Sequence, residues 1–110
     1  MPKQDAKLLQ GTLDMLILKA LSLEPLHGFG VGQRIMQMSA DALRVEEGSL
    51  YPALQRMLMK GWLVAQWDRT ADNRRARYYQ LTRAGRTQLD EERGRYRRVS
   101  AAIARILEPA

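Results

Sequence analysis

The chain has 110 residues, enough for one small domain, and its apolar and charged fractions are those of an ordinary globular protein. It carries 18 Lys and Arg against 12 Asp and Glu, a formal charge of +6, and 14 of the basic residues are arginine. Such a cationic domain suits a polyanion, either nucleic acid or an anionic membrane surface, although charge for solubility explains the same balance. The absence of cysteine excludes disulfides and thiolate metal sites.

The composition also argues against an enzyme, a metal site and a membrane protein. One histidine, no cysteine and no convergent pair of carboxylates leave no nucleophile with its base and no set of metal ligands. The longest apolar run, residues 15–18, is far too short to span a bilayer, and the first ten residues lack the apolar core of a signal peptide. We therefore expect a cytoplasmic protein without a cofactor.

The first half of the chain has helical periodicity. After the polar residues 1–10, apolar side chains recur at helical spacing over residues 12–21 and widen beyond one stripe, which predicts a helix covered on more than one side. A turn with proline and glycine follows, and a second helix is predicted over residues 28–42. Residues 46–61 form the third predicted helix.

The third predicted helix has two different faces. Leu50, Leu54 and Leu58 recur at the spacing of one buried face. The other face carries Ser49, Tyr51, Pro52, Gln55, Arg56 and Lys60. Pro52 is expected to be tolerated because early helical N–H groups have no intrahelical partner. Such a face fits phosphates and base edges, and it equally fits an exposed surface that meets only solvent.

After the third helix the period changes to two. Residues 62–67 and 77–81 are rich in aromatic and branched side chains and are predicted to be strands, joined by the charged loop of residues 68–76 into a long hairpin. The large aromatic residues are expected to pack on the core or a strand face: Trp62, Trp67 and Tyr79. The basic residues of the hairpin are Arg69, Arg74, Arg75 and Arg77.

Three helices followed by a hairpin is the order of a winged helix-turn-helix, so we predict a mainly α fold with a small β-hairpin. In that fold the third helix enters the DNA major groove, and the hairpin is a wing that contacts the backbone or minor groove. The predicted DNA-binding domain covers residues 1–82. His27, before the second helix, is interpreted as a cap or packing residue of the turn, with a phosphate contact as the alternative.

Residues 83–110 are predicted to be a long C-terminal dimerisation helix that begins after Thr82 and runs to about residue 108. The residues assigned to its apolar stripe are Leu89, Tyr96, Val99, Ile103, Ile106 and Leu107. The steps from Tyr96 to Ile106 form a short heptad seam, which is best buried against a second copy in a two-fold dimer. Packing against the first helix is the alternative. A dimer suits DNA because two third helices about 34 Å apart match successive major grooves.

Four segments in this order resemble one known family: LLQGTLDMLILKAL, PLHGFGVGQRI, VEEGSLYPALQRMLMKGWL and ARYYQLTRAGRTQL. The chain resembles the PadR-like transcriptional regulators over residues 8–89, and its single last helix is similar to the smaller branch of that family. The resemblance implies a homodimeric winged-helix repressor that binds double-stranded DNA at palindromic operators. It carries DNA contact onto Ser49, Tyr51, Pro52, Gln55, Arg56, Arg74 and Arg75.

The resemblance also implies release by a small-molecule effector. Some members bind flat aromatic molecules at the dimer interface, between the first and last helices. In this chain that position corresponds to Met15, Leu18, Tyr96 and Val99. The last helix has no tryptophan that would stack on such a molecule.

A second hypothesis is a winged-helix protein–protein module whose basic face binds an acidic partner. It predicts weak, sequence-independent DNA binding. The combination of Tyr51, Gln55 and Arg56 favours the DNA-binding hypothesis, because that mixture can recognise base edges as well as charge.

Overall fold

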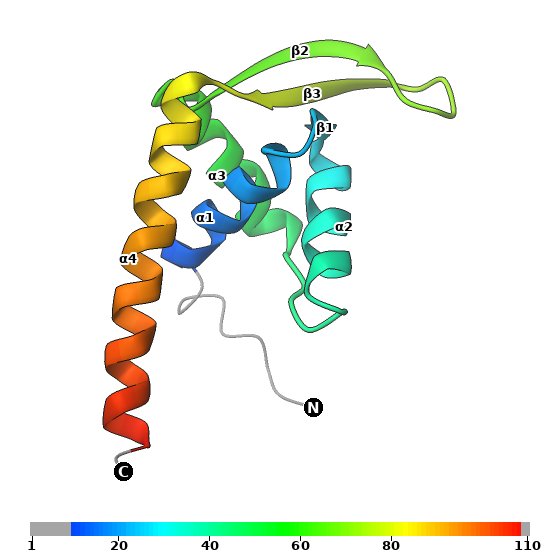
Figure 1. Ribbon diagram of the computed structural model, residues 1–110. Coiled ribbons are helices and arrows are strands. Elements are labelled where there is room, and N and C mark those ends of the chain that lie inside the picture. The colour runs from blue at the N-terminus through cyan, green and yellow to red at the C-terminus, as the bar shows by residue number, and fades with distance from the viewer. Residues whose placement is uncertain (1–9, 109–110) are drawn as a thin grey trace.

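The computed structural model describes residues 10–108, and it confirms the predicted mainly α fold with a hairpin and a long last helix (Figure 1). The elements are α1 (Gln10–Leu21), β1 (Leu26–His27), α2 (Gly28–Met38), α3 (Glu47–Met59), β2 (Leu63–Arg69), β3 (Arg75–Leu81) and α4 (Arg83–Leu107). The sheet lies over one end of the helices, and α4 runs along their side. Residues 1–9, for which the sequence predicts only a polar segment, lie outside the described residues.

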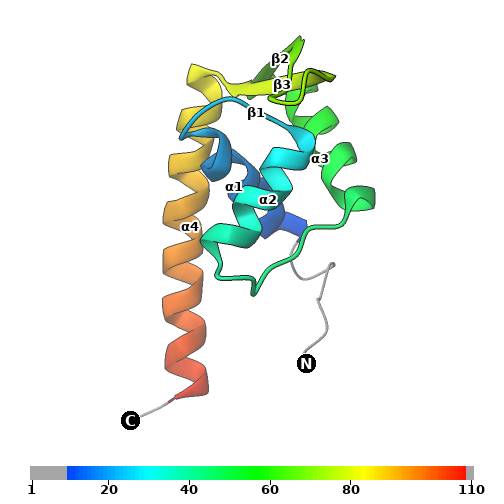
Figure 2. The same ribbon diagram turned by 90° about the vertical axis from the view of Figure 1, so that its right-hand side faces the viewer.

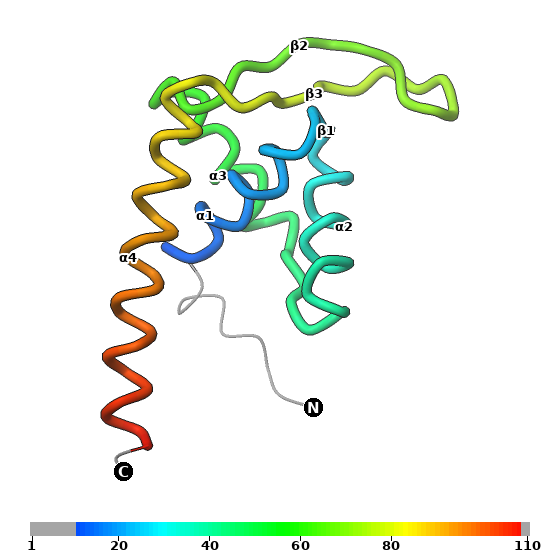
Figure 3. Tube along the Cα trace, viewed as in Figure 1, coloured from blue at the N-terminus to red at the C-terminus, as the bar shows by residue number. Residues whose placement is uncertain are grey.

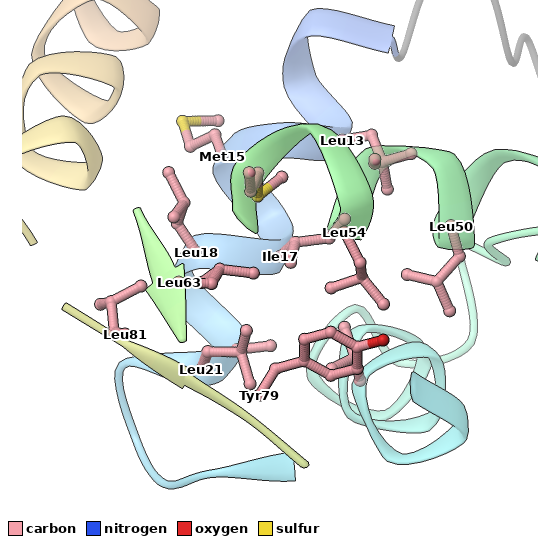
Figure 4. Packing of buried hydrophobic residues seen from close by; sticks show 14 of the residues in the cluster. Leu13, Met15, Ile17, Leu18, Leu21, Leu50, Leu54, Leu63, Tyr79 and Leu81 are labelled. Atoms are coloured by element: carbon pink, nitrogen blue, oxygen red, sulfur yellow. The ribbon is translucent and has the colours of Figure 1, made fainter. Parts of the chain in front are cut away.

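The core is built around α1. Ile17 and Leu18 are fully buried, and α1 is covered on more than one side, as predicted. Leu54 of α3 and Leu63 of β2 point into the same core (Figure 4). Because burial of a large aliphatic side chain is worth roughly 1.5–3 kcal/mol, this shared core fixes α3 and the hairpin relative to each other.

The end of α3 determines where the hairpin begins. Gly61 has a φ of 78°, in the left-handed region that favours glycine. Its N–H donates to the Leu58 carbonyl at 3.0 Å, and the Trp62 N–H donates to the Met57 carbonyl at 3.0 Å. This paired arrangement ends a helix and reverses the chain, so β2 starts directly over the core.

The sheet has three antiparallel strands in the order β1-β3-β2. Leu63 lies opposite Leu81, and the pairing continues outward to Arg69 opposite Arg75. The third strand, β1, pairs Leu26 with Tyr79. The sequence does not predict it, because two residues are too few to show a period.

The hairpin has longer strands and a shorter connection than predicted. The predicted loop over residues 68–76 is wrong in extent, since only residues 70–74 lie between β2 and β3. The Thr70 N–H donates to the Arg74 carbonyl at 2.8 Å, and the Asn73 N–H donates to the Thr70 carbonyl at 2.9 Å. Asn73 takes a φ of 64°, which asparagine tolerates better than most residues. The tip is therefore an ordered turn.

Helix α2 ends at Met38, so its prediction to residue 42 is wrong. Ala40 and Asp41 have φ values of 53° and 67°, which stop the helix. The Ser39 hydroxyl accepts from the Leu43 N–H at 3.0 Å and holds the turn that leads to α3.

Helix α4 has two different halves. Near its start Leu89, only 5% exposed, packs in the core of its own chain, which leaves it little surface for a partner chain. The C-terminal half extends past the other described elements (Figures 2 and 3). Its exposed apolar residues are Tyr96, Val99, Ile103, Ile106 and Leu107. The division into two domains at Thr82 stays a prediction. Within the described residues no helix is long and apolar enough to cross a membrane.

Candidate nucleic-acid interface

The two faces predicted for α3 are present. Leu50 and Leu54 are buried, and Tyr51, Pro52 and Gln55 form an outward row. The row ends at Met59, which is 80% exposed. We call this set, Tyr51, Pro52, Gln55 and Met59, the reading row. Met59 was not among the predicted contacts, because a methionine beside apolar residues is typical of a core.

Pro52 has a different structural setting from the one predicted. The N–H of Leu50 already donates to the Glu46 carbonyl at 2.9 Å, so the helical ladder has begun before Pro52. Pro52 therefore removes one bond that would reach the Gly48 carbonyl. The helix tolerates this because Gly48 is exposed, where water can hydrogen-bond its carbonyl.

The remaining predicted residues of α3 lie along one edge of the reading row. Arg56 follows Ser49 by seven residues and precedes Lys60 by four. This spacing places all three on one side of the helix. Ser49 is half-buried, and the Lys60 ammonium lies 4.7 Å from the centre of the Trp62 ring. These three side chains border the reading row rather than belong to it.

Arg56 is bound by another part of the same chain. Its Nη2 donates to Asp14 Oδ1 of α1 at 2.7 Å. Burial raises the pKa of the Asp14 carboxyl, and the Arg56 guanidinium opposes that shift without cancelling it. Arg56 must leave Asp14 to reach a base edge. Sequence reasoning missed this contact because nothing in the pattern of α3 points to a residue 42 positions away.

The N-terminus of α2 lies beside Tyr51. A Cβ at Gly28 would be 2.5 Å from Tyr51 Cε1, so the ring occupies the space above this glycine. Burial and then the neighbouring Glu47 carboxylate raise the pKa of Tyr51, which keeps its hydroxyl protonated as a donor. His27 caps α2, because its Nδ1 accepts from the Gly30 N–H at 3.0 Å. The cap interpretation is confirmed.

The arginines of the hairpin differ in the contacts that their guanidinium groups make. Arg69 Nη1 donates to the Asn73 carbonyl at 3.1 Å and so closes the tip. The Arg77 guanidinium carbon lies 5.9 Å from the centre of the Tyr79 ring. Arg74 is exposed on the turn. All four arginines are exposed, but Arg69 and Arg77 also have contacts within the hairpin.

The aromatic residues of the hairpin do not all pack in the core. Tyr79 is buried, as predicted, and Trp62 packs partly buried against the core. Trp67, 57% exposed, does not reach the core and packs on the strand face, the other setting that was predicted for it. The cause is length, since β2 and β3 extend past the edge of the helices and their core-facing positions continue with them.

A cleft of about 850 Å³ separates the hairpin from the N-termini of α2 and α3. Among its lining residues are Phe29, Tyr51, Trp67, Arg74, Arg75 and Arg77. The structure thus brings the predicted wing arginines and Tyr51 to one place. Phe29, 60% exposed, was not predicted, because the sequence at the start of this helix indicated only a close approach of the backbone, from Gly30 and Gly32.

The predicted effector site is only partly accessible. Met15 and Leu18 are 9% and 0% exposed and pack in the core of their own chain, so their role in an effector site stays a prediction. Tyr96 and Val99 are about half exposed on α4. Over residues 10–108 there is no group of acidic, histidine or cysteine side chains placed to hold a metal ion.

Known proteins resemble both the sequence and the fold. The sequence profile described as "Transcriptional regulator PadR-like family" matches residues 17–91. The transcriptional regulator Rv3488 of Mycobacterium tuberculosis is 40% identical over 61% of this chain, an alignment that covers 59% of that regulator.

Among solved structures, a PadR-like transcriptional regulator from Bacillus cereus is 26% identical with a TM-score of 0.80, covering 94% of this chain and 99% of that chain. A transcriptional regulator from Clostridium thermocellum has a TM-score of 0.84 over 93% of this chain and 99% of that chain. At 19% identity the latter likeness concerns the fold alone.

Proposed function

Because the chain belongs to the PadR-like family of transcriptional regulators, we propose that it is a homodimeric repressor that binds a palindromic operator. Helix α3 enters the major groove of each half-site, and the hairpin contacts the adjacent backbone or minor groove. Regulators of transcription are not enzymes, and the described residues fit binding rather than catalysis.

The observation that carries this proposal is the cleft. Tyr51 at the start of the reading row borders the same open space as Arg74, Arg75 and Arg77 of the hairpin. Phosphate contacts fix a protein's register on DNA, and base-edge contacts give specificity. Gln55 and Met59 suit base edges, because an amide pairs with adenine and an apolar group packs on a thymine methyl. Arg74 and Arg77 suit phosphates.

The dimer rests on the exposed seam of α4. Tyr96, Val99 and Ile103 are each about half exposed, and Ile106 is 76% exposed. An apolar seam of this regularity is stable in water only when it is covered. A second copy of α4 across a two-fold axis covers it with the same residues.

Release by a small-molecule effector is the part of the proposal that rests on the family resemblance. Tyr96 and Val99 are the two assigned residues with exposed surface, and both belong to the proposed dimer seam. An effector bound there would act on the way the two copies pack. It is tested by adding candidate aromatic molecules to the protein–DNA complex and measuring dissociation.

Fluorescence anisotropy tests the DNA-binding function. A labelled duplex from the region upstream of the protein's own gene is titrated at several salt concentrations, with a scrambled duplex as control. We expect preferential binding to the upstream duplex and an affinity that falls steeply with salt. Weak binding that is equal for both duplexes supports the protein–protein module instead, and no salt-dependent binding to any duplex overturns the proposal.

A further inference from the structure

The strands of the hairpin extend beyond the core, and the face that packs on the core near the helices extends with them. In a strand, alternate residues lie on one face, so Leu63, Trp67 and Arg69 of β2 share a face with Leu81, Arg77 and Arg75 of β3. Near the helices that face is buried at Leu63 and Leu81. Farther out, Trp67, Arg75 and Arg77 of this face line the cleft, where the hairpin extends beyond the helices (Figure 1). We call this outer part, Trp67, Arg69, Arg75 and Arg77, the wing underside.

One pair on the wing underside is in contact. The guanidinium carbon of Arg75 lies 4.7 Å from the centre of the Trp67 ring. Trp67 is directly opposite Arg77, so Arg75 reaches it along the diagonal of the ladder. A guanidinium over an indole face is held by the ring quadrupole. A guanidinium that packs its face on an indole keeps its N–H edge free for an acceptor.

Neighbouring arginines are held in other ways. Arg69 bonds to the Asn73 carbonyl within the tip, and the Arg77 guanidinium is farther from its ring, at 5.9 Å. Arg75 and Trp67 both line the cleft, across from Tyr51. The exposed indole has no other partner among the ring and cation contacts of the described residues. Its one evident use is to orient Arg75.

We propose that Trp67 is a positioning residue for DNA binding: it holds the Arg75 guanidinium so that its N–H edge meets one backbone phosphate of the DNA strand beside the cleft. A planar guanidinium binds a phosphate through two parallel hydrogen bonds, and this geometry demands a fixed orientation. The inference rests on the proposed function, and it names Trp67 as the residue on which the phosphate contact of Arg75 depends. A phosphate contact carries no sequence information, so the loss is equal for all bound duplexes.

The test is a double-mutant cycle measured by anisotropy on the upstream duplex. Arg75→Ala is expected to weaken binding about tenfold and to lower the salt slope by about one. Trp67→Leu is expected to weaken it nearly as much in the wild-type background but less than about twofold in the Arg75→Ala background. Trp67→Tyr keeps an aromatic face and is expected to retain most of the affinity.

Arg74→Ala supplies the matched control, because Arg74 is adjacent in sequence and Trp67 does not hold it. Trp67→Leu is expected to weaken binding equally with and without Arg74→Ala. An equal effect of Trp67→Leu with and without Arg75→Ala overturns the inference, since Trp67 then acts on its own or through the fold. A loss that depends on the bases flanking the site overturns the phosphate assignment. Wild-type protein that binds no duplex refutes the proposed function itself, so the two failures are distinct.

Discussion

Gln55 and Arg56 are adjacent in α3, yet the fold treats them differently. Gln55 is exposed in the middle of the reading row, and Arg56 lies at its edge in an ion pair with Asp14. To contact DNA, Gln55 has to exchange only water. Arg56 must give up the Asp14 carboxylate, which would then remain partly buried without its partner.

We therefore expect Gln55→Ala to reduce operator affinity more than Arg56→Ala. Loss of an amide that binds a base edge weakens binding by about 1–3 kcal/mol, mainly on the preferred sequence. Arg56→Ala removes a residue that already has a partner within the chain, so its effect on operator affinity is smaller. Anisotropy titrations of both variants on the upstream and scrambled duplexes measure this difference. The reverse order would show that Arg56 leaves Asp14 on binding.

Gly28 gives a second prediction at this scale. A methyl group there collides with the Tyr51 ring, which is 42% exposed and has to move aside, so Gly28→Ala should destabilise the fold by about 1 kcal/mol. Denaturant unfolding monitored by circular dichroism measures the change in the free energy of unfolding.

Tyr51→Ala provides the control, because it empties the space that the methyl group needs. In that background Gly28→Ala should be neutral or stabilising, since alanine is the better helix former. An equal loss of stability with and without the Tyr51 ring contradicts the packing of Tyr51 on Gly28.

Helices and strands whose apolar pattern repeats over many residues were predictable from the sequence. The buried leucines of α3 define its helix and its outer face, and alternation after Gly61 defines the hairpin. The extent of the hairpin was not predictable, because residues 68–69 and 75–76 are polar or small and are paired through their backbone. Strand β1 is ordered by its pairing with β3, which sequence periodicity cannot reveal.

The sequence predicted which residues belong to the candidate site better than it predicted how they are arranged. Tyr51, Gln55 and the wing arginines follow from the pattern of their elements. The Asp14–Arg56 pair and the exposure of Trp67 depend on contacts between distant segments and on where the core ends. No local pattern contains that information, so both required the structure.

A charge placed in the exposed apolar seam of α4 should prevent dimerisation. Ile103→Glu places a charge in the middle of it, and burial of that charge opposite its own copy is unfavourable. We expect the variant to sediment as a monomer and to lose most of its operator affinity. Ala101→Glu makes the same charge change on the far side of α4 and should leave the dimer intact. A dimeric Ile103→Glu variant would remove this seam from the interface.

At the scale of the whole molecule, the described chain leaves two surfaces uncovered. One is the reading row with the wing underside, and the other is the seam of α4. A two-fold dimer through α4 buries the second surface and presents two copies of the first. With a formal charge of +6 per chain, we expect the proposed dimer to be drawn to DNA before any base is recognised.

Hydroxyl-radical footprinting of the upstream region tests whether a dimer binds two half-sites, because it reports both copies on one DNA at single-nucleotide resolution. Two protected stretches of inverted symmetry, with centres about 10–10.5 base pairs or a multiple of that spacing apart, are the predicted result. A single unsymmetrical stretch, or protection that spreads evenly along the duplex, would contradict a dimer that reads two half-sites with its α3 helices.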